Sequence, residues 1–316
     1  MKNRVFIIGN WALQYSWFIR TFREGFERLG YDVYGMDLRQ NQDRVDMIYD
    51  YMRELKPTYI FDHMSFRKWP YQQQLFDVFH KMRKQGSKVV HVLGDAYLER
   101  YRKDLSDMFD CVLLGKTQNM KRLSSEWKVP IHYCLYSSLI YPVISRPIKE
   151  LSYDELVFTG NPNIHQDRSK FLRRLREIMP LKIFQTQGPN DKRNLTRELS
   201  ISAKAILGAC TGYDVNGYVD VRPFQFLGAG ACMIMRKFKD MDKIFPEDIY
   251  YPFDSYDDPY VVKELFERAC KENTMPMRKR AFEFIQTYHN CKKRMSDVIE
   301  VIEGRKDKIP QLLEDL

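Results

Sequence analysis

The sequence lacks the short motifs of several common enzyme classes. It contains no G-x-G-x-x-G dinucleotide fingerprint, no G-x-x-x-x-G-K-[ST] phosphate loop and no G-x-S-x-G nucleophile elbow. These absences argue against a dinucleotide-dependent oxidoreductase, a P-loop nucleotidase and a hydrolase with a serine elbow.

Patterns for metal sites and disulfides are also missing. The six cysteines include no C-x-x-C pair, and the six histidines include no pair four residues apart. We therefore expect reduced, mostly buried thiols, and neither a metal ion nor another cofactor.

Long apolar runs are absent as well. No run reaches the roughly 18 residues that a membrane-spanning helix needs. The run from Val5 to Ile8 is too short for the apolar part of a signal peptide. The sequence thus predicts a cytoplasmic protein without a membrane span.

Positive charge is distributed unevenly along the chain. The formal net charge is +9, and residues 1–150 contribute +7 of it because they hold 24 Lys and Arg against 17 Asp and Glu. Contacts to phosphates are electrostatic and need no sequence motif, so this excess favours a polyanion such as nucleic acid. A small anionic substrate, as in many basic enzymes, is the alternative.

Strand and helix patterns alternate through the first half of the chain. Short apolar runs predict strands, and amphipathic stretches that end at Gly or before Pro predict helices. The expected strands cover residues 5–9, 32–38, 58–63, 88–93, 110–114 and 131–135. This alternation predicts an α/β fold with a doubly wound parallel sheet.

A second series of alternating patterns follows a stretch that contains Pro142 and Arg146-Pro147. Such a stretch is typical of a linker between domains. We therefore predict two Rossmann-like domains that face a central cleft, one over residues 1–145 and the other over residues 146–276. A helix over residues 277–302 and a tail to residue 316 are expected to pack back on the first domain.

Catalytic candidates follow the expected strands of the first half, because ligands of such sheets bind beyond the carboxyl ends of the strands. Asp95 comes after a strand and Gly94, which makes it the first candidate for a general base, and a helix N-cap is the alternative. Asp62 and His63 are the rival acid–base pair. Neighbouring residues of a strand point to opposite faces, which weakens that pairing.

A polar loop begins the second half at Gly160. Asn161, Asn163 and Arg168 follow it, and together they suit a diphosphate or, equally, an ordinary turn between a strand and a helix. Another glycine-rich loop contains Gly212 and Tyr213, which can wrap a pyrophosphate and a sugar or form a surface loop.

A helix that starts near Arg222 offers the most informative pattern. Arg222 and Gln225 share one face near its N-terminus, where unpaired N–H groups and the helix dipole favour an anion. Gly228 and Gly230 let the helix end close to its neighbours. A well-packed amphipathic helix with no ligand is the alternative.

Basic and aromatic residues are interleaved in the first half. The stretch contains Arg67, Lys68, Trp69 and Tyr71, and the following helix and strand add Lys81, Arg83, Lys84 and Lys88. Such a stretch can follow a phosphate backbone while an aromatic ring stacks on a base. A solvated surface explains the same pattern.

The segments that carry a family resemblance are Val157 to Asn161, Arg222 to Gly230 and the acidic-aromatic stretch between Ile249 and Asp258. On the basis of these segments, the chain resembles the GT-B glycosyltransferases of the group 1 type, especially the CgeB-like branch. The resemblance covers most of the chain and is specific in residues 155–262. It implies that residues 1–145 bind the acceptor and that residues 146–276 bind a nucleotide sugar, with UDP as the expected nucleotide. Arg222 would then approach the diphosphate of this donor. Gln225 stands where that family usually has a Glu for the donor ribose, a departure that removes a charge.

The resemblance also bears on the acceptor. Related GT-B enzymes of bacteriophages glycosylate hydroxymethylated bases in DNA, and the basic first domain favours this acceptor. A base flipped out of the duplex needs residues that fill or line the gap. A surface glycan, a protein or a small molecule is the alternative acceptor, and a non-catalytic nucleic-acid-binding protein is the alternative function. The expected donor-binding residues are Gly9, Asn10, Gly160, Asn161, Asn163, Arg168, Gly212, Tyr213, Arg222, Phe224 and Gln225, and the expected acceptor-binding residues are Arg67, Lys68, Trp69, Tyr71, Tyr97 and Arg100.

Overall fold

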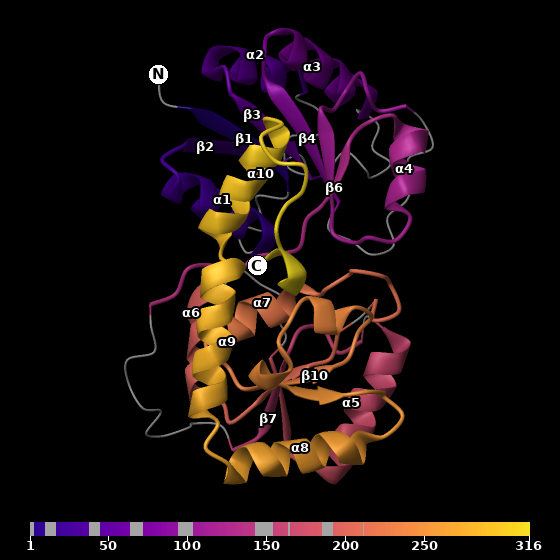
Figure 1. The fold of residues 1–316 in the computed structure, drawn as a ribbon, viewed down its shortest axis with the longest axis vertical. Coiled ribbons are helices and arrows are strands. Elements are labelled where there is room, and N and C mark those ends of the chain that lie inside the picture. The colour runs from indigo at the N-terminus through magenta and orange to yellow at the C-terminus, as the bar shows by residue number, and fades with distance from the viewer. Residues whose placement is uncertain are drawn as a thin grey trace. The chain divides into compact units, whose positions relative to one another are not determined.

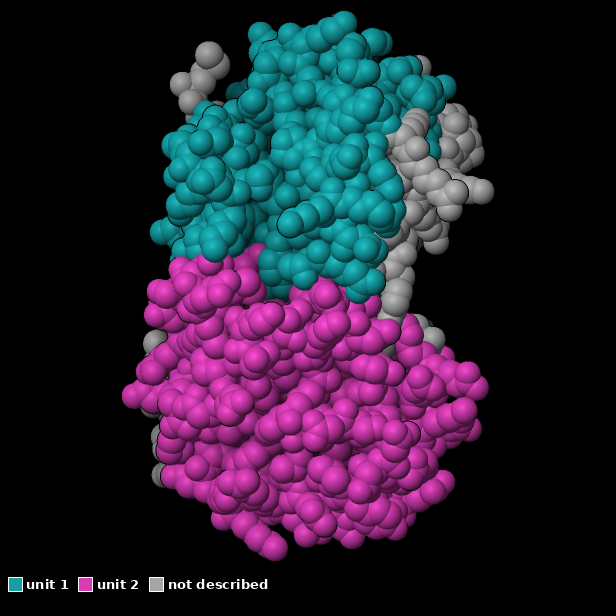
Figure 2. All heavy atoms as spheres, turned by 45° about the vertical axis from the view of Figure 1, so that its right-hand side comes forward, with its two compact units in different colours: residues 1–135, 291–310 teal, residues 136–290, 311–316 magenta. Residues whose placement is uncertain are grey.

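A computed structural model describes residues 3–9, 17–37, 45–63, 72–93, 104–142, 154–163, 165–184, 192–210 and 212–316. The chain forms two compact units, which Figure 2 shows in different colours. Unit 1 consists of residues 1–135 and 291–310, and unit 2 of residues 136–290 and 311–316. The chain therefore leaves unit 1, builds most of unit 2, returns to complete unit 1 and ends in unit 2.

Unit 1 contains a parallel six-stranded sheet in the order β2-β1-β3-β4-β5-β6 (Figure 1). Its strands are β1 (Arg4–Gly9), β2 (Asp32–Asp37), β3 (Tyr59–Asp62), β4 (Lys88–Leu93), β5 (Cys111–Leu114) and β6 (Ile131–Tyr133). Its helices are α1 (Trp17–Arg28), α2 (Val45–Leu55), α3 (Gln72–Lys84), α4 (Met120–Trp127) and α10 (Cys291–Ile302).

Helices cover both faces of this sheet, which explains why its strands are apolar at consecutive positions. Ile60 belongs to the core under α2 and α3, whereas the next residue, Phe61, packs against Phe22 of α1 at 5.5 Å between ring centroids. On the α1 side, α10 lies next to α1 (Figure 1). Gly25 permits this approach, because a Cβ there would lie 2.5 Å from the carbonyl oxygen of Cys291.

Unit 2 contains a parallel five-stranded sheet in the order β11-β10-β9-β7-β8. Its strands are β7 (Leu156–Thr159), β8 (Leu181–Phe184), β9 (Ile206–Gly208), β10 (Met233–Arg236) and β11 (Tyr251–Phe253). Its helices are α5 (Gln166–Ile178), α6 (Lys192–Ser202), α7 (Val221–Leu227), α8 (Pro259–Lys271) and α9 (Met275–Tyr288), with short 3₁₀ helices at Met241–Lys243, Glu247–Ile249 and Leu313–Asp315. Phe158, Ile234 and Phe253 from the strands meet Phe171 of α5 and Phe266 of α8 in one core.

The predicted α/β class with parallel sheets is confirmed. The helix expected over residues 277–302 is instead two helices, α9 and α10, because the chain leaves the helix at His289 and Asn290. There the side chain of Asn290 donates to the carbonyl oxygen of Gln286 at 2.6 Å, and the His289 carbonyl accepts from the Ser138 N–H at 2.8 Å. Helix α6 was not predicted, and the boundary expected between residues 145 and 146 lies outside the described residues.

Each sheet has a point where the order of strands reverses direction along the sheet. In unit 1 the chain moves from β1 to β2 on one side and then to β3 on the other side of β1. In unit 2 it moves from β7 to β8 and then to β9 on the other side of β7. Ligands of open α/β sheets bind at such points, beyond the carboxyl ends of the strands. We therefore expect a ligand site next to the residues that follow β1 and β3 in unit 1, or β7 and β9 in unit 2.

Candidate functional site

In unit 2, Gly160 follows β7 at this point of reversal. Its φ of +124° is unfavourable for residues with a side chain, and a Cβ at this position would lie 2.5 Å from Nη2 of Arg222. The Gly160 loop and the α7 segment, which are far apart in the sequence, thus lie against each other. Glycine is required here both for the turn and for the close approach of the arginine.

Arg222 is held in one orientation by two partners. Its Nε donates to the carbonyl oxygen of Thr159 at 3.0 Å, and its Nη1 forms an ion pair with the carboxylate of Asp220. Asp220 is also the N-cap of α7, where its Oδ1 accepts from the backbone N–H of Arg222 at 3.3 Å. The N-terminus of this seven-residue helix therefore already holds a carboxylate, so the expected anion site cannot depend on it.

Arg168 approaches the same place from the first turn of α5. Its Nη2 donates to the carbonyl oxygen of Asn161 at 2.9 Å, and its guanidinium and that of Arg222 lie 5.7 and 5.6 Å from the ring centroid of Phe158. Burial, and next the positive charge of Arg222, lower the pKa of Arg168. The buried Nε of Arg168 forms no hydrogen bond with any residue in the described part of the chain. The two positive charges of Arg168 and Arg222 thus lie close together, and the Nε of Arg168 is an unused hydrogen-bond donor among the described residues.

A third arginine, Arg236, ends β10 at the same edge of the sheet. The buried thiol of Cys210, which follows β9, interacts electrostatically with Arg168, Arg222, Arg236 and Asp220. Burial raises the pKa of this thiol, so it stays protonated and is a poor nucleophile. We call Arg168, Arg222, Arg236 and Asp220 the arginine cluster, and its formal net charge is +2 because one carboxylate accompanies three guanidiniums.

The other predicted donor-binding residues of unit 2 have different surroundings. Asn161 uses its side chain within its own turn, where Oδ1 accepts from the N–H of Asn163 at 2.8 Å. Gly212 has a φ of +70°, and Tyr213 lies half-buried against the guanidinium of Arg236. Gln225 is half-buried on α7. Of these residues, Asn161 contacts the arginine cluster through Arg168, and Tyr213 contacts it through Arg236.

Phe224 is a residue for which the prediction was wrong. Its side chain is fully buried, and its ring lies 5.3 Å from that of Phe245 and 5.4 Å from that of His289 between centroids. The reason is the direction of the helix face, since Phe224 points into the core of unit 2 and Gln225 does not. The Phe224 side chain therefore packs α7 against its neighbours.

The predicted acid–base pair of unit 1 is also different in the structure. Asp62, the last residue of β3, has its Oδ2 2.7 Å from Nδ1 of His91 on β4, and both side chains are fully buried. The two residues are opposite each other in the parallel register, which explains why Asp62 pairs with His91 and not with His63. His63 is half-buried, and Gly9 ends β1 beside it. A fully buried Asp62 is in no position to touch a substrate.

Several predicted residues lie outside the described part of the chain. They are Asn10, Arg67, Lys68, Trp69, Tyr71, Asp95, Tyr97 and Arg100. Their roles stay predictions from the sequence.

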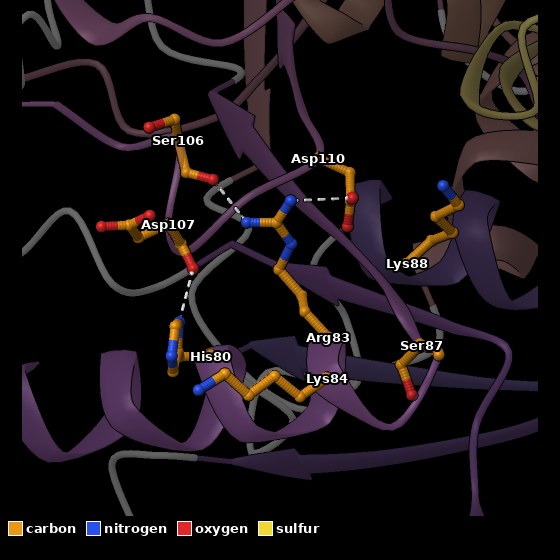
Figure 3. Close-up of a pocket in the computed structure, with 9 residues that line it drawn as sticks. His80, Arg83, Lys84, Ser87, Lys88, Ser106, Asp107 and Asp110 are labelled. Atoms are coloured by element: carbon orange, nitrogen blue, oxygen red, sulfur yellow. Dashed lines mark hydrogen bonds and ion pairs between the residues drawn. The ribbon is translucent and has the colours of Figure 1, made fainter.

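The basic residues of α3 and β4 line a cavity of about 390 Å³ at the amino ends of β4 and β5 (Figure 3). Figure 3 shows the guanidinium of Arg83 between Ser106 and Asp110, where it donates to the Ser106 carbonyl oxygen and lies 3.1 Å from the Asp110 carboxylate. Lys81 lies over the ring of Tyr49 instead. Arg83 thus fixes the segment before β5. Its guanidinium is already paired within unit 1, unlike a cation of the predicted surface that follows a phosphate backbone.

The described residues contain no group of three or more His, Cys, Asp or Glu side chains arranged to hold a metal ion. Among these residues, no helix combines the length and the apolar character needed to cross a bilayer.

Comparison with known proteins adds the functional class. A family described as glycosyl transferase-like matches residues 168–300, a range that includes all four members of the arginine cluster. A search of curated protein sequences finds no match.

Solved structures share the fold over nearly the whole chain. Sucrose-phosphate synthase from Thermosynechococcus elongatus is 10% identical with a TM-score of 0.59, covering 96% of this chain and 100% of that one. A glycosyltransferase from Rickettsia africae is 10% identical with a TM-score of 0.58, covering 96% and 98%. Anabaena HepE, solved with UDP and glucose, is 9% identical with a TM-score of 0.58, covering 96% and 100%.

Identities of this size show the fold alone, and the fold is GT-B. The family match adds a glycosyl transferase-like domain at residues 168–300. The chain is therefore an enzyme of the glycosyltransferase class with a GT-B fold.

Proposed function

We propose that this enzyme transfers a sugar from a UDP-sugar to an acceptor hydroxyl, and that the arginine cluster holds the diphosphate of the donor. The observation that carries the proposal is the cluster's net charge of +2 at the reversal point of the unit 2 sheet. The diphosphate of a sugar nucleotide carries two negative charges, which this cluster would neutralise. Guanidinium N–H groups also match the geometry of phosphate oxygens.

Individual residues have separate parts in this proposal. Arg222, fixed by Thr159 and Asp220, presents a rigid fork, and the Nε of Arg168 adds a further donor. Gly160 allows the guanidinium of Arg222 to approach the backbone closely, which places it at the end of β7. Gln225 offers an amide oxygen to a ribose hydroxyl without adding a negative charge next to the diphosphate. Anabaena HepE, which has a similar fold, was solved with UDP and with UDP-glucose, which supports UDP as the first donor to test.

Calorimetric titration with UDP, UDP-glucose and other nucleotide sugars tests the donor site. Replacing Arg222 by Gln removes a charge-assisted hydrogen bond and is expected to weaken donor binding by about 1.5–3 kcal/mol. Arg268→Gln is the matched control, because Arg268 lies exposed on α8 in an ion pair with Glu272. Unchanged affinity of Arg222→Gln for every donor that the wild type binds would exclude this site.

For the acceptor, we propose a hydroxymethylated base in DNA, on the ground that residues 1–150 carry +7 of the net charge. The protein is incubated with radiolabelled UDP-sugars and separately with unmodified DNA, hydroxymethylated DNA, a polysaccharide extract and a protein extract. Label that enters only hydroxymethylated DNA supports this acceptor. Label that enters only the polysaccharide or a protein contradicts it.

For an inverting reaction, the proposed general base is Asp95. Asp95→Asn should then lose roughly 100-fold or more in turnover while donor binding survives. NMR of the product anomer shows whether the configuration inverts. Full activity of Asp95→Asn would remove this residue from the mechanism.

A further inference from the structure

Arg236 is an unusual buried cation. The residue is 7% exposed, and its Nε and Nη1 atoms are buried without a hydrogen bond to any residue that the structure describes. Leaving a buried donor unsatisfied costs about 1–3 kcal/mol, and more for a charged group. Buried polar groups are nearly always satisfied, so an arginine with two unused donors needs a functional explanation.

Two tyrosine rings cover this guanidinium. Its Cζ lies 3.2 Å from the ring centroid of Tyr213 and 3.9 Å from that of Tyr256. The attraction between a cation and an aromatic ring offsets part of the cost of burial. It does not supply acceptors for the Nε and Nη1 protons.

The two tyrosines differ in how firmly they are held. Tyr256 is 7% exposed, its hydroxyl donates to the Cys210 carbonyl oxygen at 2.7 Å, and its ring packs at 4.7 Å against Phe171. Tyr213 is half-buried and comes directly after Gly212, whose φ of +70° suits glycine. Its backbone carbonyl is anchored by the N–H of Lys239 at 2.9 Å. Tyr213 therefore has a fixed backbone and a side chain that is less enclosed than that of Tyr256.

The charge around Arg236 favours an anionic ligand. Arg236, Arg168 and Arg222 all act on the Cys210 thiol, so the three guanidiniums are grouped around this residue at the end of β9. The carboxylate of Asp220 is already paired with Arg222. An anion that enters this edge of the sheet therefore meets a third guanidinium behind the ring of Tyr213.

We propose that Arg236 is a third donor-binding residue and that Tyr213 covers it in the ligand-free enzyme. This inference rests on the donor site proposed above. When the diphosphate enters, the Tyr213 side chain turns away, and Nε and Nη1 of Arg236 donate to phosphate oxygens. Tyr256 stays in contact with the guanidinium.

This arrangement has a measurable consequence for binding. The competent state, with Tyr213 displaced, is only a fraction of the ligand-free population, so the cover lowers the apparent affinity by that fraction. Removing the ring should raise the affinity and abolish the displacement step. Removing the fork of Arg236 while keeping its charge should lower the affinity.

Stopped-flow and calorimetric measurements with UDP test this inference on the full chain. The observed binding rate of the wild type should level off at high UDP, because displacement of Tyr213 becomes limiting. Tyr213→Ala should bind UDP about threefold more tightly or better, with a rate that rises linearly over the same range. Arg236→Lys should bind about tenfold more weakly. Tyr260→Ala is the matched control, since Tyr260 is an exposed tyrosine of α8 in the same unit.

The outcomes separate this inference from the proposed function. If no nucleoside diphosphate binds to the wild type, both are overturned. If Arg222→Gln loses UDP affinity while Tyr213→Ala binds more weakly than the wild type or with the same saturating rate, only the cover is overturned. The Tyr213 variant decides the matter even where Arg236→Lys does not fold.

Discussion

Gly160 and Arg222 form a single arrangement in which the absence of one side chain makes room for the other. A Cβ at Gly160 would lie 2.5 Å from Nη2 of Arg222, and Nε of the same arginine donates to the carbonyl oxygen of the preceding Thr159 at 3.0 Å. The end of β7 thus shapes the position of a side chain that α7 contributes. The orientation of Arg222, the residue proposed to bind the phosphate, depends on this contact.

Gly160→Ala is expected to lower stability and donor affinity together. The φ of +124° costs about 1–3 kcal/mol for a residue with a side chain, and the added methyl group displaces the guanidinium of Arg222. Urea denaturation and calorimetry with UDP measure the two effects. Gly30→Ala is the control, because its φ is +87° and a Cβ there meets nothing within 4 Å. Wild-type UDP affinity in Gly160→Ala would contradict the prediction.

Removing one member of the Asp62–His91 pair should destabilise unit 1. Both side chains are fully buried at 2.7 Å, and a buried group left without its partner costs about 3–5 kcal/mol. Asp62→Ala and His91→Leu should therefore each be costly, and the double variant should lose clearly less than the sum of the two. Urea denaturation of all three measures this coupling. Strict additivity would show that the two residues are energetically independent.

Arg278→Met should weaken the link between α6 and α9 in unit 2. Arg278 is buried and donates to the carbonyl oxygens of Ser200, Ala203 and Lys204 at 3.0, 2.7 and 2.8 Å, which completes the end of α6. Losing these bonds should cost about 3–5 kcal/mol, because buried carbonyls lose a charged donor. Arg280→Met is the matched control, since an exposed pair such as that of Arg280 with Asp248 contributes about 1 kcal/mol or less. Equal losses in the two variants would refute this role.

The stability of unit 1 should fall in mild acid through His132. Burial lowers the pKa of His132 from its usual 6.5, although a hydrogen bond with the backbone of Asp307 acts in the opposite direction. Below pH 6.5 the unfolded chain therefore binds a proton at this residue more readily than the folded chain does. The contribution is present above that pH and is lost as the pH falls through the folded-state pKa. Urea denaturation at about pH 7.5 and 5.5 should show a smaller loss for His132→Gln than for the wild type. Equal losses would assign the acid sensitivity to other groups.

The sequence by itself determined the class of the fold and several members of the site. Short continuous apolar runs and amphipathic runs of period 3.6 are local properties, so they predict strands and helices without knowledge of the tertiary contacts. Gly160, Arg168 and Arg222 were identified in the same way, because their residue types after a strand or at a helix start suit an anion. Boundaries and some whole elements, such as the 11 residues of α6, were less well predicted, since packing decides them.

Only the tertiary structure decided which of these residues meet. Asp62 pairs with His91 because β3 and β4 are neighbours in parallel register, a fact that depends on strand order. Arg236 shows no motif of its own, and it joins Arg168 and Arg222 because β10, β9 and β7 end at the same edge of one sheet. Phe224 turns inward for the same kind of reason. Strand order and helix orientation arise from burying apolar surface across the whole unit, so no local stretch of sequence contains them.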